Sequence, residues 1–239
     1  MGVDFIWYPA LGYNTHKPVA QSNLQFERAN VLYNLASLYS KLGTTSHRDP
    51  SPAGIKAACN YYCACAGVLK YLRESVIPEL RSTPPEDMDV MTLASLEQLI
   101  LAQAQECFWL KAVNDKTKDS VVARLAASVS DYYDSAAEFG TKSASIRSEW
   151  IHHMNARRNH FSAAAQFRQA CDCLEKSKYG EEVARLQDAL DSVSDAMSQG
   201  RYLNRQVLGD LMGLKEKVSE MLKGAEKDND MIYLCTPLL

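Results

Sequence analysis

Long hydrophobic runs are missing from this sequence of 239 residues. Nowhere do eighteen apolar residues follow one another, which is about the length that a membrane-spanning helix needs. The N-terminus also lacks the basic stretch followed by an apolar stretch that marks a secretory signal peptide. Neither sign of charge dominates, because the formal net charge is −3, so no overall field attracts nucleic acid or anionic lipid. We therefore expect a soluble cytoplasmic protein.

Patterns typical of disulfides, metal sites and catalysis are also scarce. The seven cysteines are odd in number and lie mostly in apolar stretches, as buried thiols of a reducing compartment do. On a helix Cys59 and Cys63 share a face, but Cys65 lies nearly opposite, and no nearby ligand completes a tetrahedral site. Cys171 and Cys173 fail in the same way. Phosphate-binding glycine loops and the Gly-x-Ser-x-Gly turn of hydrolases do not occur. We expect no metal, no cofactor and no enzymatic activity.

Three histidines lie close together in residues 150–161. On a helix His153 and His160 share a face two turns apart, while His152 points elsewhere. A zinc protease would need two histidines one turn apart with a glutamate between them, and this pattern is missing. Packing or surface roles are therefore favoured. A hydrolase centred on His152 and His153 is the less favoured alternative, because it would need an enclosed polar pocket around them.

Helical patterns fill most of the chain. Apolar residues spaced three and four apart predict helices over about 26–42, 52–80, 89–113, 118–139, 145–178, 181–197 and 204–227. Gly43 is expected to end the first of them and Pro78 to kink the second. Upstream, β-branched and aromatic residues at 3–8 and an extended piece near 19–23 predict a short β-hairpin.

Short connections between long helices predict antiparallel neighbours. Two helix pairs, 32–39 with 57–72 and 161–174 with 180–190, alternate small residues with Tyr, Phe and Leu, as tetratricopeptide-type hairpins do. The sequence thus predicts a mainly α fold, an antiparallel helical-hairpin solenoid of tetratricopeptide-like packing, with a small N-terminal β-hairpin. Surfaces of this kind commonly bind peptides or helices.

Residues 99–129 carry the most informative pattern, an apolar helix followed by a tight polar turn and a second helix. Phe108 is one of several large apolar residues spread around the first helix, and Val121 and Leu125 form an i, i+4 pair on the second. Two interpretations are open. All three side chains lie in the core, which periodicity alone favours, or they form an exposed apolar patch flanked by Lys111 and Lys118.

The same stretch carries a family resemblance. Residues 101–112, Leu-Ala-Gln-Ala-Gln-Glu-Cys-Phe-Trp-Leu-Lys-Ala, followed by Lys118-Asp119 and Ala123-Arg-Leu125, closely resemble the BRO-type domain of the Alix family. Matching segments occur in the same order at 5–8, 179–187 and 227–233. The sequences of residues 7–13 and 150–153 are most similar to those of the fungal branch of this family, which acts in the ambient-pH response.

The resemblance implies a boomerang-shaped helical domain that serves as an endosomal scaffold and is not itself an enzyme. It implies that an apolar groove binds the C-terminal amphipathic helix of an ESCRT-III subunit. Carried over by position, the groove falls on Phe108, Val121 and Leu125, with Lys111 beside them and Lys118 flanking the patch. In the fungal branch, docking brings a calpain-like protease to a zinc-finger transcription factor. An alternative is multivesicular-body sorting without a role in pH signalling.

The resemblance also implies that 1–239 is a partial BRO-type domain. The family domain is longer at its N-terminus and is followed by a V-shaped arm that binds Tyr-Pro-x-Leu peptides, so we expect this chain to lack both. The chain itself contains Tyr8-Pro9-Ala10-Leu11, but a position at the end of a strand favours a structural role there. We expect protein partners, and not a membrane segment, to bring the domain to endosomes.

Overall fold

Seven α helices and one two-stranded sheet are present in the computed structural model, which describes residues 3–238. The elements are β1 (Phe5–Trp7), β2 (Val19–Gln21), α1 (Leu24–His47), α2 (Pro52–Tyr71), α3 (Val90–Asn114), α4 (Asp119–Thr141), α5 (Ser148–Glu175), α6 (Tyr179–Ser198) and α7 (Arg205–Asp228). Single π-helical turns, η1 (Leu72–Val76) and η4 (Asn229–Tyr233), follow α2 and α7, and 3-10 turns form η2 (Glu86–Met88) and η3 (Gly200–Tyr202). The predicted mainly α fold with a small N-terminal β-hairpin is confirmed.

The chain forms two compact units. The first contains the residues up to Cys107 together with Tyr132–Ile151, and the second contains Phe108–Asp131 together with the residues from His152 onward. Helices α3, α4 and α5 contribute residues to both units. None of the helices within 3–238 is both long enough and apolar enough to cross a membrane.

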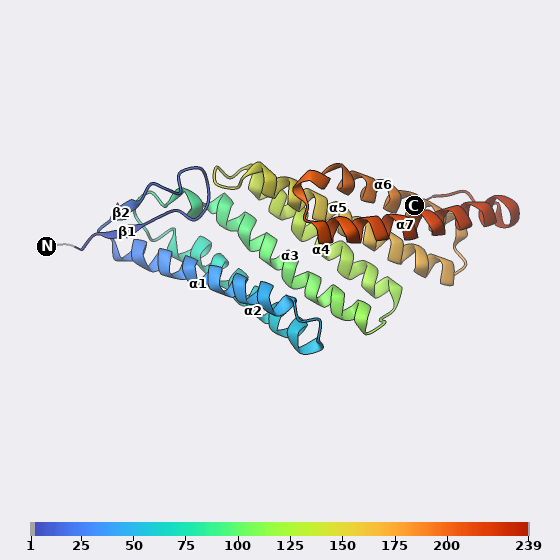
Figure 1. The fold of residues 1–239 in the computed structure, drawn as a ribbon, viewed down its shortest axis with the longest axis horizontal. Coiled ribbons are helices and arrows are strands. Elements are labelled where there is room, and N and C mark those ends of the chain that lie inside the picture. Colours follow the sequence, from blue (N-terminus) through green and yellow to red (C-terminus); the bar gives the residue numbers. More distant parts are fainter. Residues whose placement is uncertain (1–2, 239) are drawn as a thin grey trace. The chain divides into compact units, whose positions relative to one another are not determined.

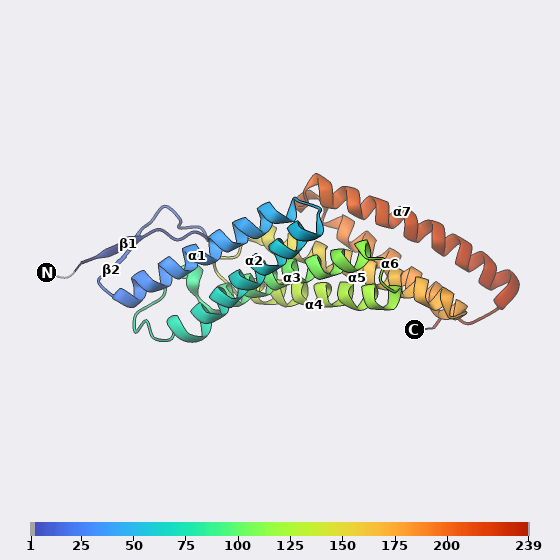
Figure 2. The same cartoon turned by 90° about the horizontal axis from the view of Figure 1, so that it is seen from below.

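The first unit is built on the antiparallel pair α1 and α2, which lie alongside each other in Figures 1 and 2. β1 pairs with β2 so that Ile6 is opposite Ala20, and the Trp7 indole N–H donates to Glu27 of α1 at 2.6 Å. Both helices begin where the sequence supplies a cap. The Asn23 side chain accepts from the backbone N–H of Gln25, and the Ser51 hydroxyl accepts from Gly54.

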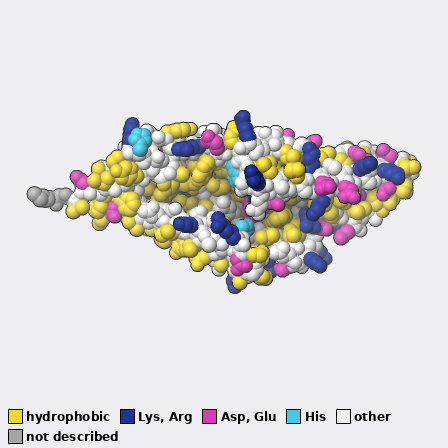
Figure 3. All heavy atoms as spheres, viewed as in Figure 1, with side chains coloured by type: hydrophobic (Ala, Val, Ile, Leu, Met, Phe, Trp, Pro, Cys, Tyr) yellow, Lys and Arg dark blue, Asp and Glu magenta, His cyan; other side chains and the backbone are white. Residues whose placement is uncertain are grey.

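The outward face of α1 is apolar. Its exposed large side chains follow the three-and-four spacing of one helical stripe: Leu24, Val31, Leu35, Leu38 and Leu42. Hydrophobic side chains accordingly reach the surface along α1 in Figure 3. The opposite face supplies Phe26, Ala29, Tyr33 and Ala36 to the core of the first unit.

Gly43 does not end the first helix, so that prediction is wrong. α1 continues to His47, and Gly43 is buried within it. A Cβ atom placed on Gly43 would lie 2.6 Å from Cε1 of Tyr62 on α2. Gly43 is therefore needed for the close approach of α1 to the Tyr62 ring, and not for a left-handed turn.

Other helices also end at residues different from the predicted ones, and local backbone conformation gives the reason. The second helix changes to the π-helical turn of η1 before it reaches Pro78, and the fourth helix runs through Gly140 to Thr141. The fifth ends at Glu175, before the predicted residue 178, because Ser177 adopts a left-handed φ of 58°. The Lys178 N–H then bonds back to the Cys173 carbonyl at 2.9 Å, which closes the helix.

Replacing Gly43 by alanine is expected to lower the free energy of unfolding by about 1–3 kcal/mol, because the buried Tyr62 ring must move. Gly67 on α2 is the matched control, since nothing lies within 4 Å of its Cβ position. Gly67→Ala should raise stability by about 0.5–1 kcal/mol through helix propensity alone. Urea denaturation measures both. Equal stabilisation by the two substitutions would show that α1 and Tyr62 are not in close contact.

The second unit has its core between α5, α6 and α7. One cluster of buried residues consists of Ala170, Val183, Leu186, Ala189, Val218 and Leu222, and a second of Ala163, Val193, Ala196, Val207 and Leu211. α6 and α7 form an antiparallel hairpin (Figure 1), and α7 is capped by the Asn204 side chain, which accepts from the Val207 N–H at 2.9 Å. Of these three helices, α5 also contacts the segment Phe108–Asp131.

Candidate partner-helix binding site

The turn between α3 and α4 is formed without glycine. Lys116 adopts a left-handed φ of 52°, and the Thr117 N–H bonds to the Ala112 carbonyl at 3.0 Å while the Lys116 N–H bonds to Val113 at 3.1 Å. This pair of bonds is the Schellman motif that commonly ends a helix. The Lys118 carbonyl then accepts the first N–H groups of α4. The chain therefore reverses within a few residues, and Phe108 and Leu125 lie at similar distances along the chain from the turn.

Side-chain contacts with α5 hold this hairpin in place. The Trp109 ring meets the Phe161 ring edge-on, with 5.3 Å between the ring centroids. Closer to the turn, Arg168 Nη1 of α5 donates to Asp119 Oδ1 at 2.8 Å. Val122 and Ala126 of α4 are buried. The Ser130 hydroxyl also donates to the Arg158 carbonyl of α5 at 3.0 Å. The segment Phe108–Asp131 is thus fixed within the second unit by an aromatic pair, an ion pair, this hydrogen bond and a buried helix face.

The predicted site residues lie at the surface or at its boundary. Phe108 is 51% exposed, which is unusual for a phenylalanine on a well-packed helix. Val121 and Leu125 are half-buried, beside the fully buried stripe to which Val122 and Ala126 belong. Periodicity alone favoured a core position for Phe108, and that prediction is wrong. Its neighbour Trp109 faces inward instead and contacts Phe161.

The two lysines of the predicted site are both exposed. Lys111 forms an ion pair with Asp115, the first residue after α3, so part of its charge is already neutralised. Lys118 lies at the start of α4, and its backbone carbonyl receives the N–H groups of Val121 and Val122. The site therefore combines apolar side chains open to solvent with a weakly positive border. It can therefore bind an apolar surface with acidic residues at its edge.

The histidines do not form one site. His152 stacks face to face on Tyr202, with 4.2 Å between the ring centroids. His160 is buried beside Phe161, and burial, with a smaller effect of the Arg157 charge, lowers the pKa of His160 to about 3. Burial likewise raises the pKa of the Cys107 thiol to about 12, so this thiol stays protonated. Among residues 3–238 no cluster of His, Cys, Asp and Glu has an arrangement that could hold a metal.

His160 makes the stability of the second unit depend on pH. Its pKa falls from an ordinary 6.5 to about 3 on folding, so the unfolded chain binds the extra proton between these values. Stability is then constant above pH 6.5 and falls by up to about 1.4 kcal/mol per pH unit below it.

We expect about 2 kcal/mol less stability at pH 5.0 than at pH 6.5, measured by urea denaturation. His160→Gln should flatten this slope, whereas His16→Gln, at an exposed position, should not. Parallel slopes in all three proteins would contradict the assignment.

A family model described as a BRO1-like domain matches residues 1–237.

The chain belongs to the BRO1-like family.

This BRO1-like chain is 60% identical over 234 residues to the pH-response regulator protein palA/RIM20 of Emericella nidulans, covering 98% of the chain and 28% of that protein. It is 34% identical to palA/RIM20 of Saccharomyces cerevisiae over 232 residues, which are 97% of the chain and 33% of that protein. Programmed cell death 6-interacting protein of Xenopus laevis is 33% identical over 216 residues, covering 90% and 24%. The resemblance to the BRO-type domain and to its fungal pH-response branch is confirmed, and the chain spans under a third of each of these relatives.

Solved structures agree with the fold of this BRO1-like chain. The structure described as the ALIX BRO1 CHMP4C complex superposes with a TM-score of 0.90 at 29% identity, covering 99% of this chain and 66% of that one. ALIX in complex with the SIVmac239 PYKEVTEDL late domain gives a TM-score of 0.87 at 28% identity, covering 98% and 33%. Both structural matches therefore cover nearly all of this chain.

Sequence reasoning missed the residues that hold the BRO1-like site in place. Phe161 and Arg168 lie about fifty residues after Trp109 and Asp119, and nothing in the local pattern links the two pairs. The i, i+4 spacing of Lys111 and Asp115 could have revealed their ion pair. The partners of Trp109 and Asp119 become visible only in the folded chain.

Proposed function

We propose that this BRO1-like chain is an adaptor domain that binds the C-terminal amphipathic helix of an ESCRT-III subunit. The binding surface is formed by Phe108, Val121 and Leu125, which together are called the α3–α4 patch below. The observation that carries the proposal is the 51% exposure of Phe108 on a hairpin that is otherwise firmly packed. Large apolar side chains kept open to water on a rigid element are typical of partner sites.

The chemistry of the α3–α4 patch fits helix-in-groove recognition. Leu or Met side chains from one face of the incoming helix would cover Phe108, Val121 and Leu125. Lys118, and Lys111 where it is not held by Asp115, would attract acidic residues of the partner and mainly affect its orientation and association rate. A patch of three side chains supports a Kd in the micromolar range, roughly −7 to −8 kcal/mol.

The names of the relatives support a role in fungal ambient-pH signalling. The 60% identity to palA/RIM20 exceeds the 33% identity to the vertebrate relative. In this role, docking on ESCRT-III at the endosome brings a calpain-like protease to its zinc-finger transcription factor, and the chain itself cuts nothing. Sorting into multivesicular bodies without pH signalling is the second candidate, and the vertebrate relative is its support.

A hydrolase centred on His152 and His153 is not proposed. The His152 ring is stacked on Tyr202, and the cavity of about 330 Å³ found in the first unit is lined by other residues. General acid–base catalysis would need a histidine that can exchange a proton near neutral pH next to a substrate. The buried His160, with its pKa of about 3, cannot do so.

The proposal is tested by titrating the chain into a fluorescently labelled synthetic C-terminal ESCRT-III helix and following anisotropy. We expect saturable binding with a Kd of about 1–10 µM, and a peptide of scrambled sequence should not bind. Absence of saturation at about 1 mM protein would overturn the proposal.

A further inference from the structure

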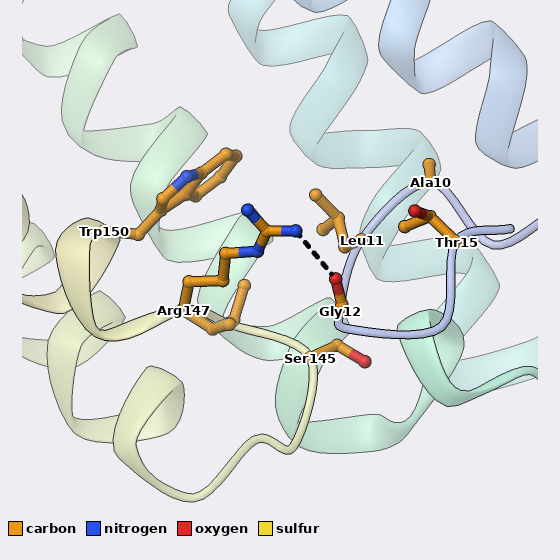
Figure 4. A pocket seen from close by; sticks show the side chains of 8 residues that line it. Ala10, Leu11, Gly12, Thr15, Ser145, Arg147 and Trp150 are labelled. Carbon is orange, nitrogen blue, oxygen red and sulfur yellow. Dashed lines mark hydrogen bonds between the residues drawn. The ribbon is translucent and has the colours of Figure 1, made fainter.

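A separate cavity lies in the first unit, between the loop that follows β1 and the start of α5 (Figure 4). Its volume is about 330 Å³, and its lining includes Leu11, Gly12, Ser145, Ile146, Arg147 and Trp150. This volume is at the lower end of what small-ligand sites occupy. It admits one amino-acid residue or a molecule of similar size, and it is too small for a helix.

The loop that forms one wall is held in place from two sides. The buried Asp87 carboxylate accepts the backbone N–H of Ala10 at 2.6 Å, and Arg147 Nη2 donates to the Gly12 carbonyl at 3.1 Å. Gly12 has a φ of +94°, which L-residues rarely adopt. The wall is therefore preformed, and a ligand would bind without the cost of ordering this loop.

The cavity offers one cation next to an apolar surface. Figure 4 shows the Arg147 side chain between Trp150 and Leu11. Arg147 uses one N–H on Gly12 and lies over the Tyr13 ring, and within residues 3–238 no carboxylate forms an ion pair with it. Trp150 is 41% exposed, and the buried Ser145 hydroxyl, part of the lining, has no hydrogen-bond partner among the described groups. A guanidinium has five N–H donors in a fork that matches a carboxylate.

We propose that this cavity binds the free C-terminal carboxylate of a peptide whose last residue is apolar. The carboxylate would accept from Arg147, and the side chain of the last residue would lie against Leu11, Ile146 and Trp150. A phosphate dianion fits less well, because the cavity has a single cation and mostly apolar walls. This site uses none of the residues of the α3–α4 patch, so either function can fail without the other.

The test follows the Trp150 indole N–H signal of the ¹⁵N-labelled chain by NMR during titration with N-acetyl-Ala-Leu. Because the ligand is small, we expect a Kd of about 1 mM. The C-terminal amide of the same dipeptide should bind at least about tenfold more weakly, since it loses the charge-assisted pair. Acetate and inorganic phosphate should also bind more weakly, because they lack the apolar side chain.

Two variants locate the site. Arg147→Met should weaken binding of the free acid at least about tenfold, while Arg28→Met, at an exposed arginine of α1, should leave it unchanged. Arg147 also holds the Gly12 loop, so Trp150→Ala provides an independent variant that keeps this bond. Trp150→Ala, followed through backbone amides of residues 145–149, should remove the preference for N-acetyl-Ala-Leu over N-acetyl-Ala-Gly. Equal binding of acid and amide, equal binding of phosphate, or retention of full affinity in Arg147→Met would each overturn the proposal.

Discussion

Phe108→Asp is expected to weaken binding of the ESCRT-III helix by about 30-fold to 1,000-fold while the chain stays folded. The substitution removes the most exposed apolar side chain of the α3–α4 patch and places a charge where the partner would bury Leu or Met. Central interface residues typically contribute about 2–4 kcal/mol, which corresponds to this loss. Because Phe108 contributes little to the core, the free energy of unfolding should change by about 0.5 kcal/mol or less.

Met212→Asp is the matched control for this experiment. Met212 is 61% exposed on α7, so its replacement introduces the same charge at an equally open apolar position of the second unit. Anisotropy titration should give the wild-type Kd for Met212→Asp. Leu125→Asp should act in the same direction as Phe108→Asp. If Met212→Asp loses as much affinity as Phe108→Asp, the effect is one of net charge and the α3–α4 patch is not the binding site.

Phe161→Ala is expected to lower the free energy of unfolding by about 3–5 kcal/mol, the usual cost of truncating a buried aromatic residue. Phe161 is 3% exposed and meets the Trp109 ring edge-on. The Arg157 guanidinium also lies over its ring, at 4.9 Å from the centroid. Removing Phe161 therefore creates a cavity and takes away the aromatic contact that holds the end of α3 on α5.

Phe108→Ala provides a control of the same residue type at an exposed position. It should cost less than about 1 kcal/mol in urea denaturation, although it weakens partner binding. We thus expect the Phe161 substitution to lower mainly the free energy of unfolding, and the Phe108 substitution to lower mainly the affinity for the partner helix. Similar losses of stability for the two alanine variants would mean that Phe108 is part of the core, and the α3–α4 patch would then be wrongly assigned.

The elements could largely be predicted from the sequence, because each has a strong local signal. Asn23, Ser51 and Asn204 cap the helices that follow them, and β-branched and aromatic residues mark the first short strand. The prediction that Gly43 ends the first helix was wrong, because the sequence does not distinguish two roles of a glycine near a helix end. Such a glycine can form a left-handed cap, or it can leave room for an aromatic ring of another helix. The ring belongs to Tyr62, and no local pattern shows that α1 and α2 approach each other there.

The candidate site was harder to predict than the fold. Phe108, Trp109 and Leu110 are consecutive large apolar residues, and periodicity cannot say which of them faces the core. The choice is made by Phe161, which meets Trp109 edge-on from α5, and this leaves Phe108 exposed. The turn posed a similar difficulty, because its left-handed residue is Lys116 and not the glycine that usually marks this motif.

The most direct test is to map the bound helix on the chain by NMR of its methyl and aromatic ring signals. With the ESCRT-III peptide at saturation, we expect the largest shifts on the methyl groups of Val121 and Leu125 and on the ring of Phe108. The methyl group of Met212, which is 61% exposed on α7, should not move. Saturable binding with the largest shifts away from Phe108, Val121 and Leu125 would show that the α3–α4 patch is not the binding site.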